Sequence, residues 1–346
     1  MKYAKDTRPE GASTEAAKIL VEALPWIKNI TGKTVVIKYG GSAMVDEKLR
    51  ADVMSDIVLL KIVGVNPVIV HGGGKAITRA MDLMEIPVEF KDGQRVTTPE
   101  AMNLVRTVLM GEVNQELVEA LNHHGNFAVG VSGADGGVIV AEQASPDLGR
   151  VGRITRINRP LLDDLVASDY IPVIASVAIG EDGGFYNVNA DMVAGHIAAA
   201  IGAHKAVFLT DVDGLYENFE DKSSLISNLT VFEARYMVEN NVVSTGMIPK
   251  LKSCIHALEN GVQRAHIING TTPHSLLLEM LTSTGVGTTM HSTEEAYRFD
   301  SHPLGKFASK LLENREEVEA AQKASTSRSE ERRGGKECRS RWSRYH

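Results

Sequence analysis

The sequence predicts an α/β fold in which an open, mostly parallel sheet is sandwiched by helices. Short runs rich in Val and Ile alternate with segments of helical periodicity along most of the 346 residues. Glycine clusters follow several of these runs directly, as is typical of turns from strand to helix. The sequence shows no internal repeat and no apolar run of bilayer length.

The first element is a helix predicted over Thr14–Ile30, capped by Ser13 or Thr14. Pro25 is expected to kink or interrupt it, and Gly32 to end it. This helix precedes the first strand, so it is an addition to the sheet. Its apolar stripe is either a surface for a partner or packs back on its own subunit; it consists of Ile19, Leu20, Ala23, Leu24 and Ile27.

Two glycine turns follow the first two strands. Thr34–Ile37 runs into Lys38–Gly41, and Val68–Val70 runs into His71–Gly74; a helix ending near Gly64 lies between. A helical pattern then places Ile77, Met81 and Met84 on one face. Backbone N–H groups of such a turn, together with a helix N-terminus, can bind phosphate or carboxylate; a plain tight turn is the alternative.

Two common nucleotide motifs do not fit the second turn. A Walker loop requires glycine where Ile69 stands, and the dinucleotide pattern requires glycine where Ile77 stands.

The remaining elements continue the alternation. We predict, in order, a polar loop over 90–98, a helix over 101–121, a strand over 127–129, a hairpin over 138–156, a strand over 171–174, an alanine-rich helix from about 191 to 200, a strand over 206–209, a strand over 262–268 and a last segment near 285.

Composition excludes several classes of protein. With a net charge of −7, nucleic-acid binding is not expected, and a small anionic substrate must be held by local positive groups. Two cysteines offer neither a disulfide framework nor metal-ligand spacing. We expect a soluble cytoplasmic protein without a membrane partner.

The C-terminal end differs from the rest. Residues 328–346 hold seven Lys or Arg against three Glu and lack apolar periodicity. We interpret them as a non-native tail resembling a translated sequencing adapter, with a basic nucleic-acid tail as the alternative. Residues 301–327 form a charged segment to which the sequence assigns no function.

Four polar or glycine clusters follow predicted strands. Because ligands bind outside the carboxyl ends of parallel strands, we expect these clusters to meet along one edge of the sheet. They are Lys38–Gly41, His71–Gly74, the loop at Ser132, and Thr210–Gly214.

Charged and polar candidates accompany these clusters. Lys38 sits where a strand becomes a glycine turn, and Lys250 follows the glycine-marked segment 245–249. Arg95 lies in the polar loop, where its rigid fork suits a carboxylate. Asn187 and Asp191 flank a strand-to-helix junction where Asp191 can hold a lysine. A structural ion pair for Lys38, a surface position for Arg95 and simple helix capping by Asn189 remain alternatives.

Eight motifs in order carry a resemblance. They are VVIKYGG at 35–41, VIVHGGG at 68–74, GQRVT at 93–97, VGVSGADG at 129–136, NVNAD at 187–191, LTDVDGLY at 209–216, STGMIPK at 244–250 and EMLTSTGVGT at 279–288. Over residues 14–290 the chain resembles the amino acid kinase family, and within it the arginine-sensitive branch of the acetylglutamate kinases. Lys75, after the glycines, departs from the usual pattern.

The resemblance implies ATP-dependent phosphorylation of the γ-carboxylate of N-acetyl-L-glutamate, the second step of arginine biosynthesis. It implies ATP and Mg²⁺ as cofactors, feedback inhibition by arginine, and a hexamer built as a trimer of dimers. It also implies a division into an N-terminal extension with an interlacing helix over 1–33, an N-acetylglutamate-binding lobe over 34–190 and an ATP-binding lobe with the arginine site over 191–300.

The roles of individual residues follow from the same resemblance. The catalytic positions are Lys38, Lys250 and Asp191, and the substrate-binding positions are Gly73, Gly74, Arg95 and Asn187. The ATP-binding positions are Gly40, Gly41, Asp211, Asp213, Gly214 and Leu215. The arginine-binding positions are Trp26, Lys205, His266, Gly270, Glu279, Gly285 and Gly287. No protein metal ligand is implied, because Mg²⁺ is held mainly by nucleotide oxygens and water.

Other members of the family phosphorylate glutamate, aspartate, carbamate or UMP, and a catalytically dead sensor is an alternative of another class. The loop around Arg95 together with 187–191 favours N-acetylglutamate as the acceptor. Retention of both Lys38 and Lys250 argues against a dead sensor.

Overall fold

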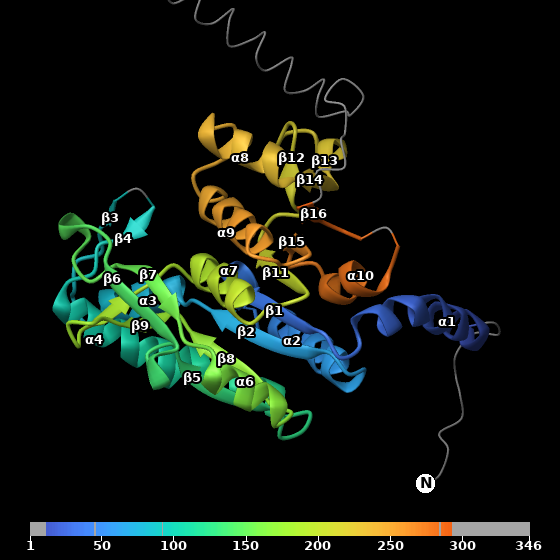
Figure 1. Ribbon diagram of the computed structural model, residues 1–346, viewed down its shortest axis with the longest axis horizontal. Coiled ribbons are helices and arrows are strands. Elements are labelled where there is room, and N and C mark those ends of the chain that lie inside the picture. The colour runs from blue at the N-terminus through green and yellow to red at the C-terminus, as the bar shows by residue number, and fades with distance from the viewer. Residues whose placement is uncertain (1–11, 45, 92, 284, 293–346) are drawn as a thin grey trace, which may run out of the picture. The chain divides into compact units, whose positions relative to one another are not determined.

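The computed structural model describes residues 12–44, 46–91, 93–283 and 285–292 (Figure 1). The chain divides into two units, residues 1–292 and 293–346, and every described residue belongs to the first. The expectations for 301–327 and 328–346 therefore lie outside the described residues.

The main sheet has eight strands and is parallel at every junction except between β15 and β16, which confirms the predicted fold class. Its order is β14-β16-β15-β11-β1-β2-β8-β5. The bounds are β1 (Thr34–Tyr39), β2 (Asn66–His71), β5 (Ala128–Ser132), β8 (Ile171–Ala175), β11 (Lys205–Thr210), β14 (Asn228–Thr230), β15 (Arg264–Asn269) and β16 (Thr288–His291).

Helices cover both faces of this sheet. The described helices are α1 (Ala12–Ile30), α2 (Glu47–Ile62), α3 (Gly74–Leu83), α4 (Pro99–Val108), the π-helical segment Leu109–Asn114, α5 (Gln115–Asn122), α6 (Pro160–Ala167), α7 (Ala190–Ala200), α8 (Val231–Glu239), α9 (Ile248–Glu259) and α10 (Ser275–Leu281).

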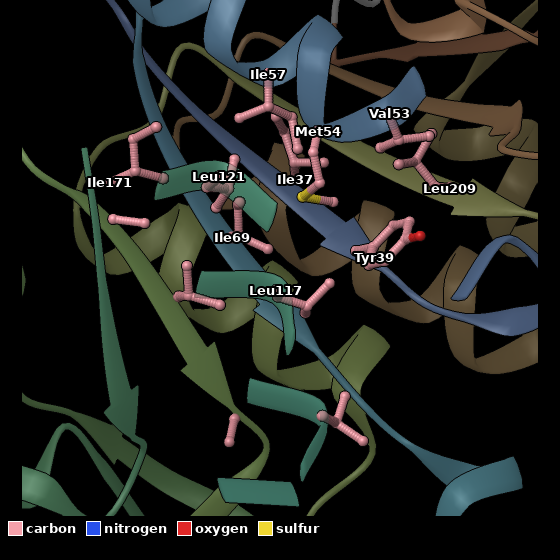
Figure 2. Close-up of a cluster of buried hydrophobic side chains, with 14 of the residues drawn as sticks. Ile37, Tyr39, Val53, Met54, Ile57, Ile69, Leu117, Leu121, Ile171 and Leu209 are labelled. Carbon is pink, nitrogen blue, oxygen red and sulfur yellow. The ribbon is translucent and has the colours of Figure 1, made fainter. Parts of the chain in front are cut away.

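A hydrophobic core lies on one face, where α2, α5 and α10 pack on alternate residues of the central strands. Ile37 and Tyr39 of β1 meet Met54 and Ile57 of α2 there (Figure 2). The helices α7 and α9 pack against β1, β11 and β15 instead, and their residues are absent from this cluster. Burial on both faces explains why the central strands are continuous apolar runs.

The predicted hairpin is confirmed as part of a second, four-stranded sheet of order β10-β9-β6-β7. Its strands are β6 (Ile139–Gln143), β7 (Gly152–Ile157), β9 (Val177–Ile179) and β10 (Phe185–Asn187). Two small antiparallel pairs join β3 (Phe90–Lys91) with β4 (Gln94–Arg95), and β12 (Leu215–Tyr216) with β13 (Leu225–Ile226). Short 3₁₀ turns span Gly41–Met44, Asp135–Gly137, Pro146–Leu148 and Lys222–Ser224.

Three local predictions are wrong. The polar loop over 90–98 contains the β3–β4 hairpin, because Phe90 and Arg95 pair across it. Met84 lies one residue beyond the end of α3 and is exposed, because the helix stops before a further buried turn. Of the two effects expected of Pro25, an interruption is wrong, because α1 continues through it; the carbonyl group that Pro25 leaves without its usual partner belongs to Val21, which is exposed to water.

The expected long helix over 101–121 is present but irregular, since a π-helical segment joins α4 to α5. Within the described residues, no helix is long and apolar enough to cross a membrane.

Candidate active site

Three of the four predicted clusters lie beside one another at the carboxyl ends of β1, β2 and β11, which are neighbouring or next-neighbouring parallel strands. A cleft of about 930 Å³ opens there, and its walls include Lys38, Gly72–Gly74, Arg95, Asn187 and Asp191. The fourth cluster does not line this cleft. Ser132 instead lines a different cavity, of about 410 Å³, together with Arg106 and Phe185.

Two lysines meet one buried carboxylate at the edge of this cleft. The Nζ atom of Lys38, on β1, lies 3.0 Å from Oδ1 of Asp191, at the start of α7. The Nζ atom of Lys250, in the first turn of α9, donates to Oδ2 of Asp191 at 3.1 Å. Burial alone raises the pKa of Asp191, but the two ammonium groups outweigh it and the pKa is lowered. The carboxylate is ionised, and the group of three carries one net positive charge.

The start of α7 is fixed from two sides. Asn189 caps the helix by accepting hydrogen bonds from the backbone N–H groups of Asp191 and Met192, at 2.9 and 3.2 Å. The Ser253 hydroxyl, on α9, donates to the backbone carbonyl of Asp191. Gly195 permits this close approach, because a Cβ there would lie 2.3 Å from the Ser253 oxygen. The helices that carry Asp191 and Lys250 are therefore held together directly.

The glycine turn forms the opposite wall. A Cβ on Gly73 would lie 2.6 Å from Cδ2 of Leu109, so the turn packs tightly at its rear. At Gly74 nothing lies within 4 Å of such a Cβ, so the front is open to the cleft. Gly74 also starts α3, whose N-terminal N–H groups favour an anion.

Arg95 is buried in the wall and is not a surface residue. Its Nη2 donates to the Gly74 carbonyl at 3.0 Å and to Oγ1 of Thr78 at 2.6 Å, while its guanidinium lies 4.7 Å from the centre of the Phe90 ring. Burial lowers its pKa, which still leaves the guanidinium charged at neutral pH. Asn187 lines the same cleft and donates to Oγ1 of Thr97 at 3.3 Å.

The predicted ATP-binding residues follow β1 and β11. A Cβ on Gly40 would lie 2.8 Å from Nζ of Lys38, so glycine leaves room for that ammonium group. Asp213 accepts hydrogen bonds from Tyr216 at 2.5 Å and from Asn269 at 2.8 Å, which lower the pKa of its carboxyl group. The backbone N–H of Leu215 donates to Oγ1 of Thr288 at 2.9 Å. Gly41, Asp211 and Gly214 lie in the same two turns.

The predicted arginine-binding residues on the last elements surround Glu279, on α10. Its Oε1 lies 2.6 Å from Nδ1 of His266 and accepts from Thr289 at 3.0 Å. Its Oε2 accepts from the backbone N–H groups of Val286 and Gly287 at 2.7 and 3.2 Å. Burial raises the pKa of Glu279, but these hydrogen bonds outweigh it and lower the pKa to about 2.

Burial lowers the pKa of His266. We favour a neutral His266 beside an ionised Glu279, because both backbone N–H groups stabilise the carboxylate whatever the state of the ring. A Cβ on Gly285 would lie 2.8 Å from Oε2 of Glu279.

The other predicted arginine-binding residues are less tightly joined to this cluster. Lys205 starts β11 and is buried; burial and Arg264 lower its pKa, and Glu279 opposes them. The backbone N–H of Gly270 donates to the Thr210 carbonyl at 2.8 Å. Trp26 is half-buried on α1, a helix that packs against α10, and it takes no part in the hydrogen bonds of Glu279.

The cleft also contains residues that the sequence did not single out. Lys75, Thr78 and Ser176 line it. Ser176 follows β8 directly, so the rule that identified the other strand ends applies to it as well. Lys75 follows the three glycines, where the sequence carries no signal for a site beyond its departure from the usual motif.

Comparison with known proteins gives clear relatives. A model of the amino acid kinase family matches residues 33–269. An acetylglutamate kinase of Caldanaerobacter subterraneus subsp. tengcongensis is 52% identical over 274 residues, which cover 79% of this chain and 92% of the relative.

Among solved structures, the N-acetylglutamate synthase of Neisseria gonorrhoeae shares the fold in two complexes. The complex with coenzyme A and N-acetyl-glutamate gives a TM-score of 0.71 at 23% identity, covering 80% of this chain and 63% of the synthase. The complex with coenzyme A and L-arginine gives a TM-score of 0.68 at 22% identity, covering 80% and 65%. At this level of identity the likeness shows the fold alone.

Proposed function

We propose the following reaction for this cleft. Its premise is that the chain belongs to the amino acid kinase family and, within it, to the acetylglutamate kinases. The enzyme phosphorylates N-acetylglutamate, in arginine biosynthesis. The acceptor is the γ-carboxylate, ATP is the phosphoryl donor, and N-acetyl-L-glutamyl 5-phosphate is the product.

One observation carries the assignment of the chemistry. The ammonium groups of Lys38 and Lys250 lie on the two oxygens of Asp191, beside the open glycine turn. An anionic acceptor and an anionic donor must approach each other here, and a net positive charge lowers the repulsion between them. Asp191 holds both lysines in fixed positions, so little reorganisation is needed as charge develops in the transition state.

The chemistry needs no general base. A carboxylate is already ionised at neutral pH, because its ordinary pKa is about 4. Catalysis then depends on alignment and on charge stabilisation, which Lys38, Lys250 and Asp191 supply.

The acceptor is held by the wall opposite these lysines. In this proposal the N–H groups of Gly73 and Gly74 bind one carboxylate, Arg95 binds the α-carboxylate and Asn187 binds the amide region. The support is their common position in the cleft and the open space in front of Gly74.

The nucleotide lies along the turns after β1 and β11. Gly40 and Gly41 approach the phosphates, and the adenine and ribose side is formed by Asp211, Asp213, Gly214 and Leu215. The Nζ of Lys38, which lies at the wall of the cleft, suits a phosphate oxygen. The described residues include no group of three or more His, Cys, Asp or Glu able to hold a metal. In this proposal Mg²⁺ would be held by nucleotide oxygens and water, and it would neutralise phosphate charge there.

A direct assay tests the reaction. The purified full chain with Mg-ATP is given N-acetyl-L-glutamate, glutamate, aspartate or carbamate, and ADP release is measured. The proposal expects strong preference for N-acetyl-L-glutamate; preference for another acceptor contradicts it.

Feedback inhibition by arginine in a hexamer is the second part of the proposal. The buried cluster of Lys205, His266 and Glu279 supports it, with a synthase of similar fold crystallised with L-arginine. On α1, the exposed apolar residues Ile19, Leu20 and Leu24 support a helix that interlaces with another copy.

Glu279 imposes a condition on that site. Each of its oxygens already accepts two hydrogen bonds from the chain itself. A guanidinium could bind both oxygens only after some of these donors move, so arginine binding must rearrange this cluster.

The division into an extension over 1–33, an acceptor lobe over 34–190 and a nucleotide lobe over 191–300 also belongs to the proposal, as does a cytoplasmic location. A buried free thiol at Cys254 suits a reducing compartment.

A further inference from the structure

The rear of the glycine turn is held by a buried histidine. His71 ends β2, and none of its surface is exposed. Its Nδ1 lies 2.9 Å from the Gly72 carbonyl oxygen, and its Nε2 lies 2.9 Å from Nδ2 of Asn114. The ring therefore joins the first carbonyl of the turn to a side chain far along the sequence.

In this series of hydrogen bonds, each donor and each acceptor can be assigned. Nδ2 of Asn114 also donates to the Val173 carbonyl at 2.8 Å, which fixes the orientation of the amide because a carbonyl can only accept. Nε2 of His71 must then accept, and Nδ1–H must donate to the Gly72 carbonyl. His71 is neutral in this arrangement, and burial lowers its pKa to about 4.

Asn114 reaches His71 because of the π-helical segment Leu109–Asn114. In an α-helix five residues advance about 1.4 turns, so Leu109 and Asn114 would point in different directions. Bonding from i to i+5 in a π turn brings them to one face. Leu109 packs against Gly73 there, while Gly130 makes room for Asn114, since a Cβ on Gly130 would lie 2.0 Å from its Oδ1.

The front of the same turn faces the acceptor cleft. Gly72, Gly73 and Gly74 line it, and Arg95 holds the Gly74 carbonyl at 3.0 Å. The turn is thus held at the front by a cleft residue and at the rear by His71, so its N–H groups have one orientation.

We propose that His71 and Asn114 are positioning residues: their hydrogen-bond chain from the Val173 carbonyl to the Gly72 carbonyl sets the glycine turn for the acceptor carboxylate. They do not touch substrate. The assignment rests on the proposed function, because the turn is taken as the acceptor site.

Two conservative variants test separately the two hydrogen bonds that the His71 ring makes. In His71→Asn the amide nitrogen stands near the position of Nδ1, so the bond to the Gly72 carbonyl is kept. In His71→Gln the side chain reaches Asn114, but the donor to Gly72 is lost. We expect the KM for N-acetylglutamate to rise on the order of tenfold in His71→Gln and less in His71→Asn, with the KM for ATP unchanged.

The matched control is His123→Gln, at the exposed end of α5, which should leave both KM values unchanged. A purely structural role would lower the melting temperature without ranking the KM values in this way. Equal acceptor KM values in His71→Gln and the parent, or a larger increase in His71→Asn, overturn the proposal.

A spectroscopic test uses the unmodified full chain, so it does not depend on the folding of a variant for its main result. The ¹⁵N NMR spectrum of histidine side chains at pH 7 should contain a neutral ring protonated at Nδ1, and His71→Asn identifies the signal by its loss. A cationic or Nε2-protonated His71 overturns the positioning role. An inactive parent that shows the expected tautomer overturns the proposed function alone.

Discussion

Asp191 and Glu279 are both buried carboxylates, yet the two regions around them are built differently. Asp191, at the start of α7, is balanced by two lysine ammonium groups. Glu279, on α10, is balanced by a histidine, a threonine and two backbone N–H groups. Both carboxyl groups have lowered pKa values, but for different reasons.

The difference lies in what each region leaves available to a ligand. An ammonium group has three donors, so Lys38 and Lys250 can still bind phosphoryl oxygens while Asp191 orients them. The four hydrogen bonds on Glu279 use its main acceptor positions. The first region is ready to act on a ligand as it stands, whereas the second must rearrange to bind a cation.

The largest expected effect comes from removing either lysine. Lys38→Ala or Lys250→Ala should lower kcat by roughly 10²–10³-fold, the scale of losing one oriented electrostatic group in a transition state. Steady-state kinetics with N-acetylglutamate and ATP measures this. Lys252→Ala, an exposed lysine of α9, is the control. A near-normal kcat in one variant would remove that lysine from the chemistry and weaken the contrast with Glu279.

Removal of Arg95 tests whether the acceptor wall is separate from the lysines. Arg95→Ala should raise the KM for N-acetylglutamate on the order of 10–100-fold with little change in kcat, because a charged hydrogen bond to bound substrate is lost. Arg153→Ala, which breaks an exposed ion pair with Glu142, serves as the control. If kcat falls while KM stays constant, Arg95 acts in the transition state instead.

Deletion of residues 1–30 tests the region around Glu279 through its neighbour α1. Arginine inhibition should be lost, a change of about 5–150-fold in arginine sensitivity for a typical coupling, and the particle should become a dimer with most of its catalysis kept. Sedimentation and inhibition kinetics measure both. The substitution Leu20→Asp tests the exposed apolar stripe without removing the helix. A deleted protein that stays hexameric and arginine-sensitive contradicts the assignment.

The smallest expected effect is the change in the free energy of unfolding caused by Glu279→Gln. The pKa of Glu279 is about 2 in the folded protein, below its ordinary 4.5, so the carboxylate contributes stability that is present above pH 4.5 and is lost as the pH falls toward 2. At pH 7 the variant should lose on the order of 2 kcal/mol of unfolding free energy.

Denaturant unfolding at several pH values measures this loss, with Glu142→Gln, an exposed glutamate, as the control. The difference between parent and variant should shrink below pH 4.5. A difference that stays constant down to pH 2 would mean that the carboxylate charge does not contribute.

Local sequence signals were sufficient for the sheet and its turns. The apolar runs at 34–37, 68–70, 171–174 and 206–209 all became strands, because burial on both faces requires continuous apolar residues. The helix cap at Asn189 was equally readable, since it depends on the next two or three backbone N–H groups alone. The end of α3 could not be predicted in this way. Met84 is exposed, because tertiary packing decides which turns of a helix are buried.

The sequence by itself therefore determined the fold class, the succession of strands and helices along the chain and the glycine turns, all of which depend on neighbours along the chain. Only the tertiary structure brought Lys38 and Lys250 to one carboxylate and buried Arg95 in the cleft wall. The tertiary structure also brought hydrogen-bond donors such as the Val286 N–H to the carboxylate of Glu279, and it brought Asn114 to His71. The physical reason is that the partners of a buried polar group come from distant segments, and no local pattern specifies which donor will reach it.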